Sequence, residues 1–310
     1  ALKNIYRDLK ISSKYFFGRS MINERFTKSP KEIILDERLL NTLEPEKLNG
    51  ETLPKQVMEI LINDEEIAAL QDYANHVSIK RLGFNDHGPV HMRTVCKNSI
   101  KMLKLLHKAG INTSLEEEGI GNFADSLTAV IFASFMHDIG MTVGRQNHEM
   151  HSGSIALPII QRVLATALPD AQDVFNMRRR IMIQSMAIEG IVGHMGTQKV
   201  HSIEAGAVLI GDGCDMTKGR ARIPMALNKE AKQGDIHKYS ANSIKKVRIT
   251  NGLENNGENG KPIRIEVTMS SEVGFFQIEE VLLPKINSST IKPYVELYAG
   301  IEDGELKNYI

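Results

Sequence analysis

The sequence predicts a mainly helical protein that ends in a small module of mixed helices and strands. Up to about residue 240, apolar residues recur at three- and four-residue steps, which is the spacing of one face of an α-helix. Beyond that point, polar and apolar residues alternate and Val and Ile become common, which is typical of half-buried strands. We therefore expect a helical extension over residues 1–79, a helical domain over 80–240 and an α+β module over 241–310.

The N-terminal extension is the least regular part of this prediction. Its first 50 residues mix basic and aromatic residues without a clear period. This composition favours an extension packed on the rest of the protein and leaves an interaction arm open as the alternative. Between Leu53 and Ile79 the apolar residues follow helical spacing, so a helix is expected there.

The helical domain is expected to contain a central buried helix and several amphipathic ones. Ser126–Met136 is apolar on nearly all sides, which indicates a helix in the middle of the core. His91–Ala109 is amphipathic, and Gly110 ends it. Further helices are expected over His148–Ala167, Met177–Gly193 and Ser202–Asp212.

The C-terminal module is expected to begin with a hairpin. Lys246–Thr250 and Pro262–Met269 alternate in polarity, and a segment rich in Asn and Gly joins them. Phe275–Ile286 is expected to be helical and Tyr294–Ala299 to be a strand. An open strand edge can pair with a second subunit. The module is therefore expected either to form a homo-oligomer, most simply a dimer, or to cap the mouth of an active site.

The composition is that of an ordinary globular protein. Its 310 residues are 42% hydrophobic and 25% charged, and 38 basic residues balance 38 acidic ones. A chain without net charge has no general attraction for nucleic acids or membranes. No apolar run approaches the roughly 20 residues of a membrane span, and two cysteines are too few for a disulfide framework. We expect a cytoplasmic protein with no membrane partner and no strong nucleic-acid signal.

Histidines and aspartates recur inside or beside apolar segments that lie far apart in the sequence. Burying such groups without partners costs about 2–7 kcal/mol each. One or two shared metal ions are the simplest way to satisfy them. The residues concerned are His87, His91, His137, Asp138, His148, His194 and Asp212.

Four of these residues resemble the pattern of the HD-domain superfamily of metal-dependent phosphohydrolases. That pattern is a histidine that opens a helix, a His-Asp doublet and a later aspartate. Here it falls on His91, His137, Asp138 and Asp212, and the resemblance covers about residues 80–225. It implies an HD-type helical bundle and a divalent metal that activates water.

His148 and His194 resemble the additional ligands of binuclear members of this superfamily. The resemblance then implies that Asp138 bridges two metals, drawn from Fe, Mn, Mg or Ni, with a mononuclear centre as the alternative. One metal would be held by His91, His137, Asp138 and Asp212. The other would be held by Asp138, His148 and His194. Asp215 is the alternative to Asp212 as the last metal ligand. We prefer Asp212, because the apolar segment before it carries it to the interior.

Asp138 and His87 are the candidate catalytic residues. Asp138 would act through the metals that it bridges. His87 lies one helical turn before His91, and in HD-GYP relatives this position holds a third metal; a contact to substrate phosphate and a solvated helix start also remain open. The Gly-Tyr-Pro signature of HD-GYP phosphodiesterases is absent after His194, so the chain does not resemble that subtype.

A basic segment follows the last aspartates. Lys218, Arg220 and Arg222 are candidates for binding the oxygens of a substrate phosphate, with a solvated loop as the alternative. The expected partner is a small phosphorylated molecule, and the resemblance implies a nucleotide-like one.

The function expected from these features is hydrolysis of a phosphomonoester or phosphodiester by metal-activated water. No glycine-rich Walker loop is present, which favours hydrolysis over kinase-like transfer. Two alternatives stay open. One is a diiron oxygenase of the HD fold, which uses the same six ligands, and the other is a regulatory module that senses a ligand.

Overall fold

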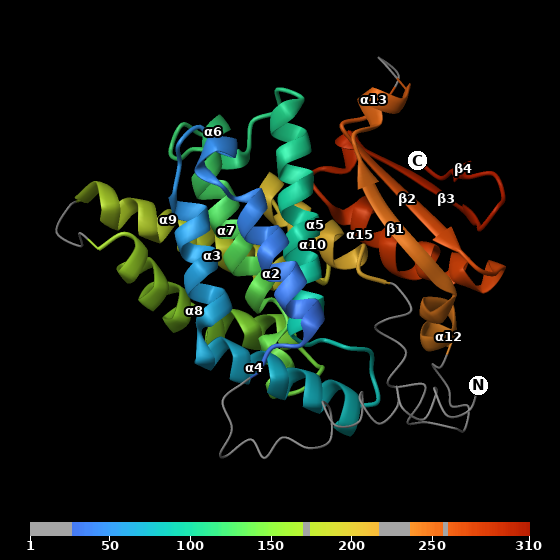
Figure 1. Cartoon of the computed structure of the whole chain (residues 1–310), viewed down its shortest axis with the longest axis horizontal. Coiled ribbons are helices and arrows are strands. Elements are labelled where there is room, and N and C mark those ends of the chain that lie inside the picture. The colour runs from blue at the N-terminus through green and yellow to red at the C-terminus, as the bar shows by residue number, and fades with distance from the viewer. Residues whose placement is uncertain (1–26, 170–173, 217–235, 257–259) are drawn as a thin grey trace.

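The computed structural model describes residues 27–169, 174–216, 236–256 and 260–310. It is mainly α-helical with a small four-stranded sheet near the C-terminus, as the sequence predicts. Figure 1 shows the helices gathered into one body and the sheet, in orange and red, on its side. None of the described helices combines the length and the apolar character needed to cross a membrane.

Three helices precede the main bundle. They are α2 (Pro30–Thr42), α3 (Leu53–Asn63) and α4 (Glu65–His76), followed by a π-helical turn over Val77–Arg81. The single helix expected over residues 53–79 is therefore divided. The cause is Asp64, whose carboxylate accepts the backbone N–H groups of Glu66 and Ile67 and so begins α4.

The main bundle surrounds α7 (Phe123–Met136). Every residue of α7 except Phe123 is buried, and it packs against α3, α5, α9 and α10. The prediction of a central apolar helix is confirmed. The remaining helices of the bundle are α5 (Pro89–Lys108), α6 (Ser114–Glu117), α8 (His148–Ala167), α9 (Val174–Gly193) and α10 (Ile203–Gly213).

The C-terminal module begins with α12 (Ile236–Ser243) and contains a sheet with the strand order β1-β2-β3-β4. Its strands are β1 (Ile244–Thr250), β2 (Ile263–Met269), β3 (Val295–Ile301) and β4 (Lys307–Asn308). The antiparallel pairing of β1 with β2 confirms the hairpin, although the short helix α13 (Gly252–Asn256) occupies part of the expected turn. The sequence did not predict β4.

A helical crossover joins β2 to β3, which run parallel. It contains α14 (Phe275–Gln277), a π-helical turn over Ile278–Leu282 and α15 (Leu283–Ser288), where the sequence predicted one helix. Both the turn and α15 contact α10, and α5 contacts β1 and β2. One continuous apolar core includes residues from the bundle and from the module. Within this shared core, α15 packs against α10.

Candidate metal centre

Six side chains from five regions of the chain meet in the interior of the bundle. They come from the first turn of α5, the end of α7, the start of α8, the residue after α9 and the last turn of α10. Each is buried, with at most 9% of its surface exposed. The six are His91, His137, Asp138, His148, His194 and Asp212. The structure thus brings together the residues that the sequence proposed as metal ligands.

The first group of donor atoms surrounds Nε2 of His91. This nitrogen lies 3.1 Å from Nε2 of His137 and 3.2 Å from Oδ2 of Asp138. Oδ1 of Asp212 is also 3.2 Å from it. Two imidazole nitrogens and two carboxylate oxygens from three helices therefore face one point, and together they can hold one ion.

The second group uses the other oxygen of Asp138. Oδ1 of Asp138 lies 3.1 Å from Nε2 of His148 and 3.3 Å from Nε2 of His194. The two imidazole nitrogens are 3.2 Å apart. Each oxygen of Asp138 therefore faces a different group, and this carboxylate could contact an ion held in either one.

The hydrogen bonds of Nδ1 determine the tautomer of each of the four imidazoles. Nδ1 of His137, His148 and His194 lies 2.9, 3.0 and 2.6 Å from the backbone carbonyl oxygens of Ser134, Arg145 and Ile191. A carbonyl oxygen only accepts hydrogen bonds, so Nδ1 must carry the proton. Nδ1 of His91 donates in the same way to the carboxylate of Asp215, over 2.8 Å. In each neutral ring, Nε2 is left with a lone pair.

These lone pairs point at one another. The Nε2 contacts between His91 and His137 and between His148 and His194 therefore join two acceptors, with carboxylate oxygens close by. No hydrogen bond can form between two acceptors, and holding several acceptors together in the interior is costly. A cation in each group satisfies all of these atoms at once, and the donor set fits divalent metal ions.

The ionisation states of the buried groups also suit metal binding. Burial opposes ionisation of Asp138, but the imidazoles of His137 and His87 hold the pKa of its carboxyl well below the usual range. Burial also opposes ionisation of Asp212, and Lys285 with His91 holds its pKa well below the usual range. Burial lowers the pKa of His194 to about 4. At neutral pH the carboxylates are charged and His194 is neutral, as metal ligands must be.

A tight turn after α7 sets the position of the His-Asp doublet. Gly140 packs so closely on the start of α8 that an added Cβ would collide with the backbone at His148 and Ser152. Its N–H donates to Oγ of Ser152 over 2.8 Å. On the other side, Asn147 adopts a left-handed conformation (φ 53°), which lets α8 begin at His148. The turn and the helix start together aim both ligands at one point.

Lys285 is a member of this site that sequence reasoning missed. Its ammonium group, on α15, forms an ion pair with Oδ2 of Asp212 and donates to the carbonyl oxygen of His194 over 2.8 Å. The residue is 8% exposed. In the sequence, this role is indicated only by the fact that Lys285 is the single charged residue in the apolar segment 281–286.

Arg145 is the second residue that the sequence did not single out. Its Nη1 lies 3.4 Å from Nε2 of His148, and its guanidinium lies over the ring of Phe84. Within the described ranges no carboxylate forms an ion pair with it. Arg145 therefore places a positive charge at the edge of the second donor group, and no local sequence pattern indicates this.

His87 lies beside the centre and is half-buried. Its ring meets that of His91 edge-on, with centroids 5.8 Å apart, and its Nδ1 lies 2.6 Å from the carbonyl oxygen of Asn85. It belongs to neither donor group. Lys218, Arg220 and Arg222, the candidate phosphate-binding residues, lie outside the described residues.

Comparison with known proteins finds one relative in an archaeon. The chain is 39% identical over 258 residues to the uncharacterized protein MJ1020 of Methanocaldococcus jannaschii, which covers 83% of this chain and 93% of that protein. No family model matches the chain. No solved structure matches it either.

Proposed function

The chain belongs to the same family as the protein MJ1020 of Methanocaldococcus jannaschii, and we propose that it is a metal-dependent phosphohydrolase of the HD-domain type. In this proposal two divalent metal ions occupy the two donor groups. The substrate is a small phosphomonoester or phosphodiester with nucleotide-like character. The helical fold and the buried His/Asp cluster are compatible with this assignment.

One observation carries the proposal. The four Nε2 lone pairs and the oxygens of Asp138 and Asp212 form two adjacent groups that share one carboxylate. Metal ions bound in such a pair of groups lower the pKa of a water molecule and neutralise charge on phosphate oxygens.

Residues around the ligands hold them in place. Asp215 accepts a hydrogen bond from Nδ1 of His91 and so keeps its ring oriented. Lys285 binds Oδ2 of Asp212, which leaves Oδ1 facing the first donor group. The bridging role of Asp138 needs both of its oxygens, and the imidazoles around it keep it ionised.

Two further residues are proposed to act on the substrate. The guanidinium of Arg145 lies beside the second group and can bind phosphate oxygens through paired N–H donors. His87 donates through Nδ1 to the carbonyl oxygen of Asn85, so Nε2 of the neutral ring carries the lone pair that can accept a proton. The basic residues Lys218, Arg220 and Arg222 stay predictions for the same role.

The donor set also narrows the choice of metal. Four imidazoles with two carboxylates suit Fe, Mn or Ni better than Mg, which prefers oxygen ligands. We therefore expect Fe, Mn or Ni to support activity and Mg to support little.

The test combines elemental analysis with phosphate release. The full chain is purified after growth with Mn, Fe or Ni and assayed with p-nitrophenyl phosphate and its bis-ester. We expect about two ions per chain and turnover of at least one of the two esters. Asp138→Asn should lose both ions and reduce turnover to background, because the bridging carboxylate contributes to both groups.

Asp303→Asn is the matched control. Asp303 is exposed and adopts φ 67°, a conformation that Asn tolerates, so this variant should keep its metal and its activity. Full turnover by Asp138→Asn would contradict the proposal. So would O₂ consumption by the iron-loaded protein without release of phosphate, which is the result expected of a diiron oxygenase.

A further inference from the structure

A cavity lies along α5, away from the candidate metal ligands. Its volume is about 740 Å³, and its walls are α5, the end of α2 with the loop that follows it, and the start of α7. Small-molecule sites usually measure roughly 300–1,000 Å³. None of the six metal ligands lines it. The cavity is therefore large enough for a ligand of its own.

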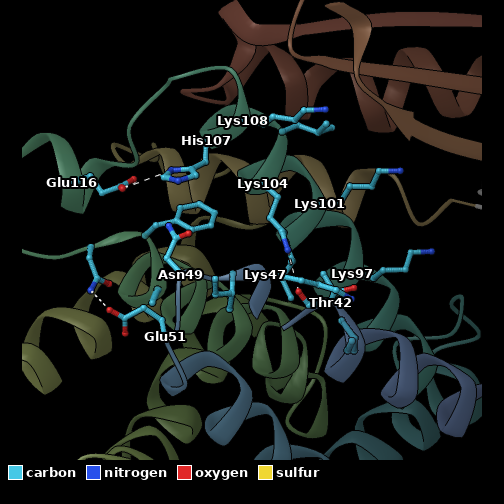
Figure 2. A pocket seen from close by; sticks show the side chains of 17 residues that line it. Thr42, Lys47, Asn49, Glu51, Lys97, Lys101, Lys104, His107, Lys108 and Glu116 are labelled. Carbon is cyan, nitrogen blue, oxygen red and sulfur yellow. Dashed lines mark hydrogen bonds and ion pairs between the residues drawn. The ribbon is translucent and has the colours of Figure 1, made fainter. Parts of the chain in front are cut away.

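One side of the cavity is strongly basic. Lys97, Lys101, Lys104 and Lys108 follow one another at steps of four, three and four residues, which places them on one face of α5. Lys47 joins them from the loop after α2. Figure 2 shows Lys47, Lys97, Lys101 and Lys104 toward the right of the cavity. Like charges at this spacing repel one another, so the face is costly unless an anion binds there.

Most of these lysines have no carboxylate partner in the described part of the chain. Among the residues that the structure describes, neither Lys97 nor Lys101 forms an ion pair or a hydrogen bond through its ammonium group. Lys104 donates to the carbonyl oxygen of Thr42 over 3.0 Å. Lys108 does have a partner, Glu254, at 2.9 Å. Burial lowers the pKa of Lys97, and Arg38 lowers it further while Asp215 opposes the shift; burial also lowers the pKa of Lys101 and of Lys104.

The other side of the cavity is apolar and aromatic. His107 stacks on Phe123 with ring centroids 4.0 Å apart, and the floor is formed by leucines and by Ile100. Asn49 and Asn122 offer amide groups. Both glutamates already have partners: Glu116 lies 3.7 Å from Nδ1 of His107 and caps α6 through Thr113, and Glu51 accepts from Asn122. Figure 2 shows His107, Asn49, Glu51 and Glu116 toward the left, opposite the lysines.

We propose that this cavity binds a phosphorylated ligand with a flat apolar body, the chemistry of a nucleoside polyphosphate. The phosphates lie against Lys97, Lys101 and Lys104, and the ring system lies on the apolar side near Phe123. This site is separate from the metal centre and does not depend on the hydrolase activity proposed above. Both sites nevertheless involve α5, which carries His91 in its first turn and the lysines along the rest of its length.

The test measures binding without metal, so that the metal centre plays no part. The full chain carrying Asp138→Asn, and the wild-type chain after treatment with a chelator, are titrated calorimetrically with ATP, adenosine and inorganic triphosphate. We expect ATP to bind to both proteins and to bind more weakly as salt rises. Adenosine and triphosphate should each bind at least about 10-fold more weakly than ATP, because each lacks one half of the contacts.

The lysines are tested by a double substitution. Lys97→Ala with Lys101→Ala should weaken ATP binding by about 10-fold or more, since hydrogen bonds to charged groups are lost. The matched control replaces two exposed lysines of the C-terminal module, Lys292→Ala with Lys307→Ala, which removes the same charge elsewhere. Circular dichroism checks that each variant is folded.

Three results would overturn this proposal. The first is ATP binding that is unchanged by the Lys97/Lys101 substitutions. The second is an equal loss in the Lys292/Lys307 control, which shows attraction to net charge alone. The third is triphosphate or adenosine that binds as tightly as ATP. Because metal is absent throughout, failure here is distinguishable from failure of the proposed phosphohydrolase activity.

Discussion

At the scale of single residues, the partner of Nδ1 decides what each histidine can do. Three of the buried histidines donate to backbone carbonyls, whose positions are fixed by the helices themselves. His91 alone donates to a side chain, that of Asp215. A carboxylate partner makes an imidazole a stronger electron donor than a carbonyl does. His91 therefore depends on a residue 124 positions away in the sequence.

Asp215→Ala should weaken metal binding in the first donor group by roughly 10–100-fold, the usual effect of losing such a partner. Asp215→Asn should fall between this variant and the wild type, because its amide oxygen still accepts from Nδ1. A competition assay with a chelating dye measures both affinities, and Asp303→Asn serves as the exposed control. Wild-type affinity in Asp215→Ala would show that Asp215 does not position His91.

The buried His194 makes the stability of the metal-free protein depend on pH. Its pKa falls from 6.5 to about 4 on folding. Between these values the unfolded chain binds a proton that the folded chain does not, so acidification favours unfolding. The free energy of unfolding should fall by up to about 1.4 kcal/mol per pH unit from this group as pH drops from 6.5 to 4.

Urea denaturation of the chelator-treated protein at several pH values measures this slope. His194→Gln has no titrating imidazole at this position, so its stability should vary less over the same range. Equal slopes in the two proteins would mean that His194 does not contribute.

At the scale of elements, α15 links the C-terminal module to the candidate metal centre. The helix packs against α10, and Lys285 reaches from it to Asp212 and to the carbonyl oxygen of His194. One side chain thus connects the module to ligands of both donor groups. The sequence predicted a helix over Phe275–Ile286, but not its contact with α10, because a helical period does not say which element a face will meet.

Lys285→Met should destabilise the metal-free protein strongly. The variant leaves the buried carboxylate of Asp212 without its cation, and such a loss costs about 3–5 kcal/mol. Bound metal replaces part of the missing positive charge, so the difference from wild type should be smaller in the metal-loaded protein. Lys292→Met, exposed and in the same module, is the control. Equal destabilisation with and without metal would show that Lys285 acts through packing alone.

At the scale of the whole molecule, the candidate metal centre lies where α5, α7, α8, α9 and α10 meet. Without a cation, the acceptor atoms of five elements face one another in the core. Metal should therefore contribute to the stability of the entire bundle, beyond its part in chemistry. The homo-oligomer remains a prediction; β1 lies at an edge of the sheet, where an oligomeric contact through a strand would form.

Removal of metal by a chelator should lower the melting temperature. At a metal concentration 100-fold above Kd, binding adds about 2.7 kcal/mol to the free energy of unfolding. For a chain of this size that corresponds to roughly 4 °C. Differential scanning fluorimetry before and after chelation measures the shift, and readdition of Mn, Fe or Ni should reverse it. In Asp138→Asn the chelator should change nothing, and an unchanged melting temperature in the wild type would contradict metal binding in the core.

The sequence by itself determined the fold class, most helices and the identity of the six candidate ligands. Helical spacing, the apolar segment Ser126–Met136 and the alternation in β1 and β2 are local patterns, and local patterns are visible in one sequence. The sequence did not predict the division of the helix at Asp64 or the strand β4. A capping side chain and a two-residue strand pairing leave little periodic signal in a sequence.

The family resemblance also implied the division of the ligands into two groups, and only the tertiary structure showed the distances within each group and what surrounds them. The places of Asp215 behind His91, Lys285 on Asp212 and Arg145 beside His148 result from the packing of separate helices. The same holds for the basic cavity, where lysines of α5 face the loop after α2. Distances between residues far apart in the chain depend on which helix faces pack together, and a single sequence carries the pattern of each face but not its partner.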